Sequence, residues 1–146
     1  AYVAKISIGA NPQQALRALR EAEAFEGTAI VICYAHCIAH GIDMMNGLHQ
    51  QQLAVQCGHW PLLRYNPDLK EVGRNPFTMD STRSGITLRD YTSGETRYKS
   101  LFTINPAHAD EIMKYAQKEV DEKWAVYGEL ARRYEREAAE KAATKA

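Results

Sequence analysis

The sequence predicts an α/β fold with a parallel β-α-β unit and a long C-terminal helix. Three patterns support this prediction: an alternating apolar–polar run at residues 2–8, an almost uninterrupted apolar run at 29–35, and helical spacing of apolar residues over about 106–138. A strand, a helix and a strand that is apolar on both faces are typical of a buried parallel sheet. At 146 residues, the chain is long enough for one domain with a sizeable core.

The first two strands are separated by a helix. Residues 2–8 form the first strand, whose apolar face contains Tyr2, Ala4, Ile6 and Ile8. Asn11 can cap the helix, Pro12 suits its first position, and Gly27 suits the turn that follows its end near residue 25. The buried stripe of the helix is expected to consist of Ala15, Leu16, Leu19, Ala22 and Phe25.

The middle of the chain gives a weaker signal. We expect a helix over about 48–57, which would present Leu48, Gln52, Leu53 and Val55 to the sheet. A short strand should follow at 61–65, with Pro61 at its start or on a sheet edge. Residues 66–84 are rich in turn-forming types and are expected to be a surface loop, which is anchored in the core by Phe77 and Met79. Residues 87–101 have no clean period.

The final helix has the clearest signal in the second half of the chain. Asn105 caps it, Pro106 takes its first position, and Asp110 and Glu111 lie near its positive N-terminal end. Its stripe consists of Ile112, Ala116, Val120, Trp124, Tyr127, Ala131, Tyr134 and Ala138, and the charged tail beyond should fray. We therefore divide the chain into an α/β part at 1–65, an irregular segment that crosses the surface at 66–104, and a helix with its tail at 105–146.

Composition narrows the classes of function. Lys and Arg together number 18, as do Asp and Glu, so no basic excess favours nucleic acid as a partner. No apolar run approaches the length of about 20 residues that a membrane span needs, and no signal peptide is evident. A cytoplasmic protein is expected. Because Ala1 begins what reads as a strand, we also expect the chain to be a piece of a longer polypeptide.

The residues with chemical potential gather at the end of the second strand. Cys37 lies where open α/β sheets place ligands, although the residues alone leave open whether it has a function. His36 and His40 flank it; together the three could hold a metal, or the histidines could support a neighbouring ligand without binding it. Cys33 and Cys57 are expected to be small buried residues. The other histidines, His49, His59 and His108, receive no role.

Several separated blocks resemble one enzyme family. YVAKISIGANPQQALRALREAEAFEG, AIVICYAHCIAHGI, QQQLAVQCGHWPLLRYNPDL and GRNPF are similar to the C-terminal part of the thiamine-diphosphate domain of pyruvate:ferredoxin (flavodoxin) oxidoreductase. The similarity is close over about residues 2–80 and looser through the last helix. It implies that residues 1–65 are the C-terminal half of an α/β thiamine-diphosphate domain.

The resemblance also implies a reaction and partners. Enzymes of this family oxidise pyruvate with coenzyme A to acetyl-CoA and CO2, and pass the electrons through [4Fe-4S] clusters to ferredoxin or flavodoxin. In the matching YAHCIAHG block, Cys37 would be the fourth ligand of the cluster nearest thiamine diphosphate, and His36, Ile38 and His40 would tune that cluster through hydrogen bonds. A homodimer is implied, in which the long helix contributes to packing or dimer contacts.

The chain also departs from the family. The Gly-Asp-Gly to Asn segment that binds Mg²⁺ and the diphosphate, the other three cluster cysteines, and the domain that grips the pyruvate carboxylate are not within it. We therefore expect the isolated piece to be inactive and to bind neither cofactor alone. Two alternatives stay open: a stand-alone binding or structural module with a minor metal site at His36, Cys37 and His40, and a sibling 2-oxoacid oxidoreductase with NADP as acceptor.

Overall fold

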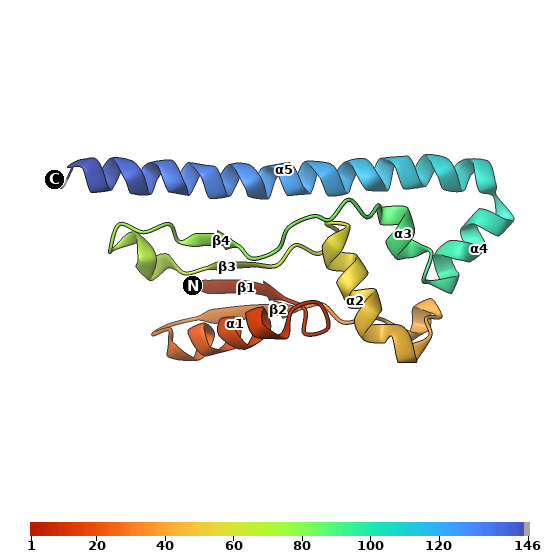
Figure 1. The fold of residues 1–146 in the computed structure, drawn as a ribbon, viewed down its shortest axis with the longest axis horizontal. Coiled ribbons are helices and arrows are strands. Elements are labelled where there is room, and N and C mark those ends of the chain that lie inside the picture. The colour runs from red at the N-terminus through yellow and green to blue at the C-terminus, as the bar shows by residue number, and fades with distance from the viewer. Residues whose placement is uncertain (145–146) are drawn as a thin grey trace.

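The computed structural model describes residues 1–144, which form a four-stranded mixed sheet between two helices (Figure 1). In chain order, the strands are β1 (Tyr2–Ile6), β2 (Ala29–Cys33), β3 (Leu63–Tyr65) and β4 (Phe77–Met79). The α-helices are α1 (Pro12–Ala24), α2 (Gly47–Gln56), α3 (Leu88–Thr92), α4 (Thr96–Ile104) and α5 (Pro106–Thr144). Short 3-10 helices lie at Ile38–His40 (η1), Met44–Asn46 (η2) and Pro67–Lys70 (η3).

The sheet confirms the α/β prediction and the parallel pair. Its strand order is β2-β1-β3-β4, and β1 runs parallel to β2 with Tyr2 opposite Ala29 and Ile6 opposite Cys33. β3, however, is antiparallel to β1, so the third strand does not extend the parallel unit. The predicted loop at 66–84 contains η3 and β4, because β3 and β4 pair as an antiparallel hairpin.

Helix α1 covers one face of the sheet and begins as predicted. The Asn11 side chain accepts a hydrogen bond of 2.9 Å from the backbone N–H of Gln14, and Pro12 occupies the first turn. Burial of apolar side chains between α1 and β1 forms the first core cluster. That cluster consists of Tyr2, Ala4, Ile6, Ala15 and Ala18.

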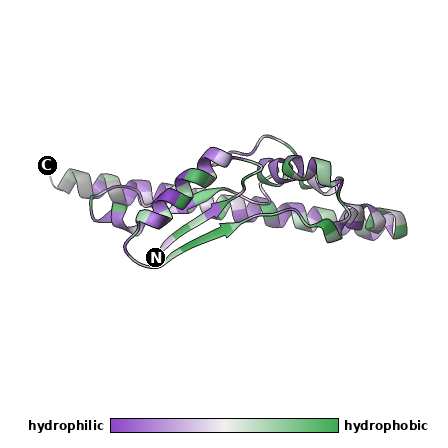
Figure 2. Ribbon diagram, turned by 90° about the horizontal axis from the view of Figure 1, so that it is seen from below, coloured by the Kyte–Doolittle hydropathy of each residue, from purple (hydrophilic) through white to green (hydrophobic). Residues whose placement is uncertain are grey.

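Much of the predicted apolar surface of this unit is exposed. Ile30 and Ile32 of β2 are 47% and 44% exposed, whereas the sequence predicted a strand buried on both faces. Leu16 and Leu19 of α1, which we expected in its buried stripe, are exposed as well. Ile30 and Ile32 lie on the face of β2 away from α1, and on that face α5 packs mainly against β4, at the other edge of the sheet. Figure 2 shows this apolar character as green colour along the strands near the N-terminus.

The face of α2 differs from the prediction. Leu48 and Gln52, expected to contact the sheet, are exposed, whereas Gln50 and Gln51 are 5% and 6% exposed. Val55 is buried as expected. The glutamines are buried because their amides satisfy polar groups of the surrounding chain, and such groups cannot be left unpaired in the interior. Hydrophobic spacing alone could not reveal that orientation.

Helix α5 covers the opposite face of the sheet from α1. The rings of Phe77 and Tyr127 stack at 6.3 Å, and those of Tyr65 and Tyr134 lie 6.1 Å apart. Near its start the helix buries Met113 rather than the predicted Ile112, in a second core cluster with α2 and α3. Residues 87–101, which had no clean period, contain α3 and most of α4.

The end of the chain is more regular than expected. The helix continues to Thr144, beyond the point near Ala138 where fraying was predicted. Residues 145–146 of the predicted tail and the side chain of Ala138 lie outside the described residues. None of the helices described over residues 1–144 is long and apolar enough to cross a membrane.

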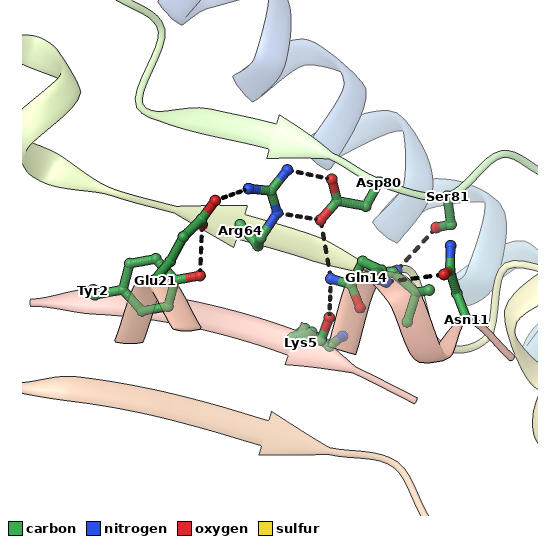
Figure 3. Close-up of polar contacts among 9 residues, drawn as sticks. Tyr2, Lys5, Asn11, Gln14, Glu21, Arg64, Asp80 and Ser81 are labelled. Carbon is green, nitrogen blue, oxygen red and sulfur yellow. Dashed lines mark hydrogen bonds and ion pairs between the residues drawn. The ribbon is translucent and has the colours of Figure 1, made fainter. Parts of the chain in front are cut away.

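A polar network ties α1 to the sheet (Figure 3). Arg64 binds both carboxylate oxygens of Asp80, at 2.7 and 2.8 Å, and also pairs with Glu21. Glu21 accepts a hydrogen bond from the Tyr2 hydroxyl, and the Gln14 amide donates to Asp80. Both charges of the Arg64–Asp80 pair are about nine-tenths buried. Removing one partner of such a buried pair strongly destabilises a protein, because the other charge is left buried without a counter-ion.

Lys5 provides a pH-dependent contribution to stability. Its Nζ lies 4.1 Å from the centre of the Trp60 ring, and burial, with the charge of Lys123, lowers its pKa to about 8. The unfolded chain holds this proton up to the ordinary pKa near 10.5, so between pH 8 and 10.5 the folded state binds fewer protons. Wild type should therefore gain stability relative to Lys5→Met as the pH rises through this window.

Urea unfolding of the chain at pH 7.5 and 9.5 measures this effect. We expect the free-energy difference between wild type and Lys5→Met to change by about 1–2 kcal/mol, since one pKa unit corresponds to about 1.4 kcal/mol and Lys5 is only partly buried. Comparison with Lys5→Met cancels the buried tyrosines and Cys57, whose raised pKa values act in the opposite direction. A difference that stays constant with pH would contradict the assignment.

Candidate functional site

The candidate site is the loop at residues 34–46, which leaves the carboxyl end of β2 and leads into α2; we call it the Cys37 loop. Cys37 is exposed and caps η1 in an extended conformation. The backbone N–H of His40 donates to the carbonyl of Cys37 over 3.0 Å, and Gly41, with φ +70°, closes the turn. The thiol is thus presented from a tight turn directly after a parallel strand.

His36 is held by α2 through Gln51. The Gln51 side-chain nitrogen donates to Nδ1 of His36 over 3.1 Å. The oxygen of the same amide accepts from the Ser7 hydroxyl and from the backbone N–H of Gly9, both at 2.9 Å. A Cβ at Gly47 would lie 2.5 Å from His36 Nε2, so a side chain there would displace the imidazole.

His40, which follows Cys37 in the loop, is held by Glu95. Its Nδ1 lies 2.5 Å from the Glu95 carboxylate, whose side chain is only 2% exposed. Gln50 donates to the second carboxylate oxygen over 3.1 Å and to the backbone carbonyl of Tyr91 over 2.9 Å. A Cβ at Gly94 would meet the Gln50 amide at 2.4 Å, which explains why glycine fits this position.

An aromatic group packs behind the Cys37 loop. The hydroxyls of Tyr34 and Tyr91 lie 2.5 Å apart, and the ring of His59 stacks on Tyr91 with centres 5.3 Å apart. Burial raises the pKa of both tyrosine hydroxyls and lowers the pKa of His59. These groups therefore stay uncharged at neutral pH, and His59, which received no role from the sequence, is a packing residue here.

The site has few groups that could bind a metal. Within residues 1–144, no three His, Cys, Asp or Glu side chains lie close enough together to hold a metal ion. The predicted minor metal site at His36, Cys37 and His40 is therefore not assembled in this structure; Nδ1 of His36 contacts Gln51, and Nδ1 of His40 contacts Glu95. Cys57 is buried as expected, but Cys33 is exposed at the carboxyl end of the edge strand β2.

Comparison with known proteins shows which enzymes this chain is similar to. No protein-family model matches the chain. Over 132 residues, or 90% of its length, it is 43% identical to the pyruvate-flavodoxin oxidoreductase of Trichormus variabilis. It is 39% identical over 130 residues to the pyruvate:ferredoxin oxidoreductase of Moorella thermoacetica. The chain is homologous to one segment of the pyruvate:ferredoxin/flavodoxin oxidoreductases.

That segment is a small part of each enzyme. The chain spans 11% of the length of both pyruvate oxidoreductases. It is also 39% identical over 111 residues, 75% of the chain, to a mitochondrial pyruvate dehydrogenase [NADP(+)] of Euglena gracilis, of which it covers 6%. The resemblance inferred from the sequence is thereby confirmed.

The sequence did not reveal the residues that support the Cys37 loop. Gln50, Gln51 and Glu95 were assigned no role, because each contacts residues 15 or more positions away along the chain. One signal was available: three consecutive glutamines at 50–52 lie on the helix predicted over 48–57. A helix of this composition can bury one of its faces only if some of its amides are buried with it.

Proposed function

We propose that this chain is the part of a pyruvate:ferredoxin or flavodoxin oxidoreductase that contributes Cys37 as a ligand of the [4Fe-4S] cluster nearest thiamine diphosphate. The observation that supports it best is the exposed Cys37 thiol on a turn that is hydrogen-bonded on both sides. A cluster of this type takes four thiolates, which can come from distant segments of the protein. The metal assigned to Cys37 is therefore iron.

The residues present fit one ligand of such a cluster and no more. Cys33 is exposed but belongs to β2, and Cys57 is enclosed in the core where burial raises its pKa. The other cysteines must come from elsewhere in the enzyme, as must most ligands for thiamine diphosphate and Mg²⁺. The isolated chain is accordingly expected to be inactive.

The exposed apolar surface supports the proposal that this is a segment of a larger enzyme. Exposed apolar side chains that gather on a surface mark sites of contact with other protein. Ile30 and Ile32 are exposed on the face of β2 away from α1, and Leu16 and Leu19 are exposed on α1 itself. We assign both groups to contact with the remainder of the enzyme, because the chain covers only 11% of the length of the relative.

The proposed overall reaction joins pyruvate and coenzyme A. Decarboxylation releases CO2, the acetyl group forms acetyl-CoA, and two electrons leave through the clusters to ferredoxin or flavodoxin. Cys37 would provide one fixed point for the first cluster on this route. The complete enzyme is proposed to act as a cytoplasmic homodimer, with α5 available for packing or dimer contacts.

Purified complete enzyme tests this reaction. We expect reduction of ferredoxin or flavodoxin that requires both pyruvate and coenzyme A, with one acetyl-CoA formed for each CO2 released. Omission of coenzyme A and replacement of pyruvate by 2-oxoglutarate are the controls, and each should abolish most of the reduction. Reduction of NADP⁺ instead would favour an enzyme like the Euglena relative, whereas no pyruvate-dependent reduction of any acceptor would refute the proposal.

A further inference from the structure

Two adjacent residues at the start of α4 hold two adjacent residues of the turn that carries Cys37. Glu95 contacts Nδ1 of His40, while the Thr96 hydroxyl donates to the carbonyl of Gly41 over 2.6 Å. The backbone N–H of Thr96 reaches the same carbonyl at 3.3 Å. The turn at residues 37–41 is therefore attached to α4 by three hydrogen bonds from a segment 55 residues away in sequence.

The path from Glu95 to Cys37 is short and continuous. Glu95 contacts the His40 side chain, and the His40 backbone N–H donates to the carbonyl of Cys37 at 3.0 Å. Movement of His40 would therefore move the backbone from which the thiol is presented. We propose that Glu95 is a positioning residue for Cys37, acting through His40; this inference rests on the proposed role of Cys37 as a cluster ligand.

The burial of Glu95 supports a dedicated role. A carboxylate that is 98% enclosed is costly unless its oxygens are hydrogen-bonded. Here one carboxylate oxygen contacts His40, and the other accepts a hydrogen bond from Gln50. The Gln50 amide is itself held by a hydrogen bond to the Tyr91 carbonyl and by the close approach of Gly94. The carboxylate is thus held in one orientation by Gln50 and His40, and it also interacts with the Tyr91 side chain.

The histidine on the other side of Cys37 is fixed in a parallel way. Gln51, next to Gln50 on α2, holds His36 directly, while Gln50 holds Glu95, which holds His40. Consecutive buried glutamines therefore reach the two histidines that flank Cys37. Support of this kind restricts the orientation of a ligand and is known to affect the properties of the bound metal.

The test compares substitutions in the complete enzyme by redox titration followed by electron paramagnetic resonance. We expect Glu95→Ala to change the reduction equilibrium of the nearest cluster about tenfold, which is about 59 mV for one electron. Glu95→Gln retains an acceptor for His40 Nδ1 and should show a smaller change. His40→Ala should produce the same change as Glu95→Ala, and the double substitution should produce no more, because the two residues act as one unit.

Asp80→Ala is the matched control. Asp80 is a comparably buried carboxylate that pairs with Arg64 in the network between α1 and the sheet. It should lower stability without changing the potential or spectrum of the cluster. A wild-type potential in Glu95→Ala, an equal change in Asp80→Ala, or additive changes in the double substitution would each overturn the inference. If Cys37→Ser left the iron content unchanged, the proposed ligand itself would be refuted.

Discussion

Replacing Cys37 by Ser in the complete enzyme is expected to remove about four iron atoms per chain and most of the pyruvate-dependent reduction of ferredoxin. A serine alkoxide is a poor substitute for a thiolate, which is the ligand that iron–sulfur clusters require. Loss of a residue that only supports a ligand typically costs about 10- to 100-fold in metal affinity or activity. Loss of the ligand itself should cost more.

Cys33→Ser provides the matched control for this substitution. Cys33 is also exposed and lies only four residues earlier, but it belongs to β2 rather than to the turn. Its replacement should leave iron content and electron transfer within about twofold of wild type, a small effect typical of exposed positions away from a site. If Cys33→Ser abolished the cluster and Cys37→Ser did not, the ligand would be misassigned.

Replacing Arg64 by Met is expected to destabilise the contact between α1 and the sheet by about 3 kcal/mol. The substitution leaves the carboxylate of Asp80 largely buried without its counter-ion, and it removes the partner of Glu21. Breaking a buried pair by removing one partner typically costs about 3–5 kcal/mol, and we take the lower value because Glu21 is 31% exposed. In the complete enzyme, amide exchange of peptides covering β1 and β3 should accelerate about 100-fold.

Arg133→Met is the matched control for Arg64→Met. Arg133 pairs with Glu137 one helical turn away on α5, where both side chains are exposed. Exposed pairs of this kind contribute little to stability, so exchange in β1 and β3 should not change. Equal protection in Arg64→Met and wild type would show that the network of Figure 3 does not hold α1 in place.

The secondary structure could be predicted from the sequence where helix-capping residues and apolar spacing indicated the same element. Asn11 and Pro12 placed the start of α1, and Pro106 placed the start of α5. The short strand β4 was missed because Phe77 and Met79 lie among turn-forming residues, and only pairing with β3 makes them a strand. Pairing of this kind is a tertiary effect that a local pattern does not contain.

Burial was predictable only where the neighbouring elements lie within the chain. The two-sided apolar pattern of β2 indicated a central buried strand, yet β2 is an edge strand in this segment. If the remainder of the enzyme covers it, as proposed, the pattern records contacts with residues outside the chain. On that proposal, the apolar sequence at 29–35 indicates burial against residues outside this chain.

Some residues of the candidate site could be predicted from the sequence, and others could not. Cys37 could be selected because a strand end and a family resemblance both pointed to it. Glu95 and Gln50 could not, because a buried carboxylate in a loop and a helical glutamine look like surface residues until their partners are known. Their function in the site depends on contacts 45 to 55 positions apart along the chain.

The most direct test of the central claim is a structure of the complete, cluster-loaded enzyme by electron cryo-microscopy. The account predicts continuous density between Sγ of Cys37 and one iron of the cluster nearest thiamine diphosphate, with the other three thiolates supplied from outside residues 1–146. His40 should still contact Glu95 beside this turn. A cluster whose four ligands are all found elsewhere, with Cys37 remote from iron, would contradict the account.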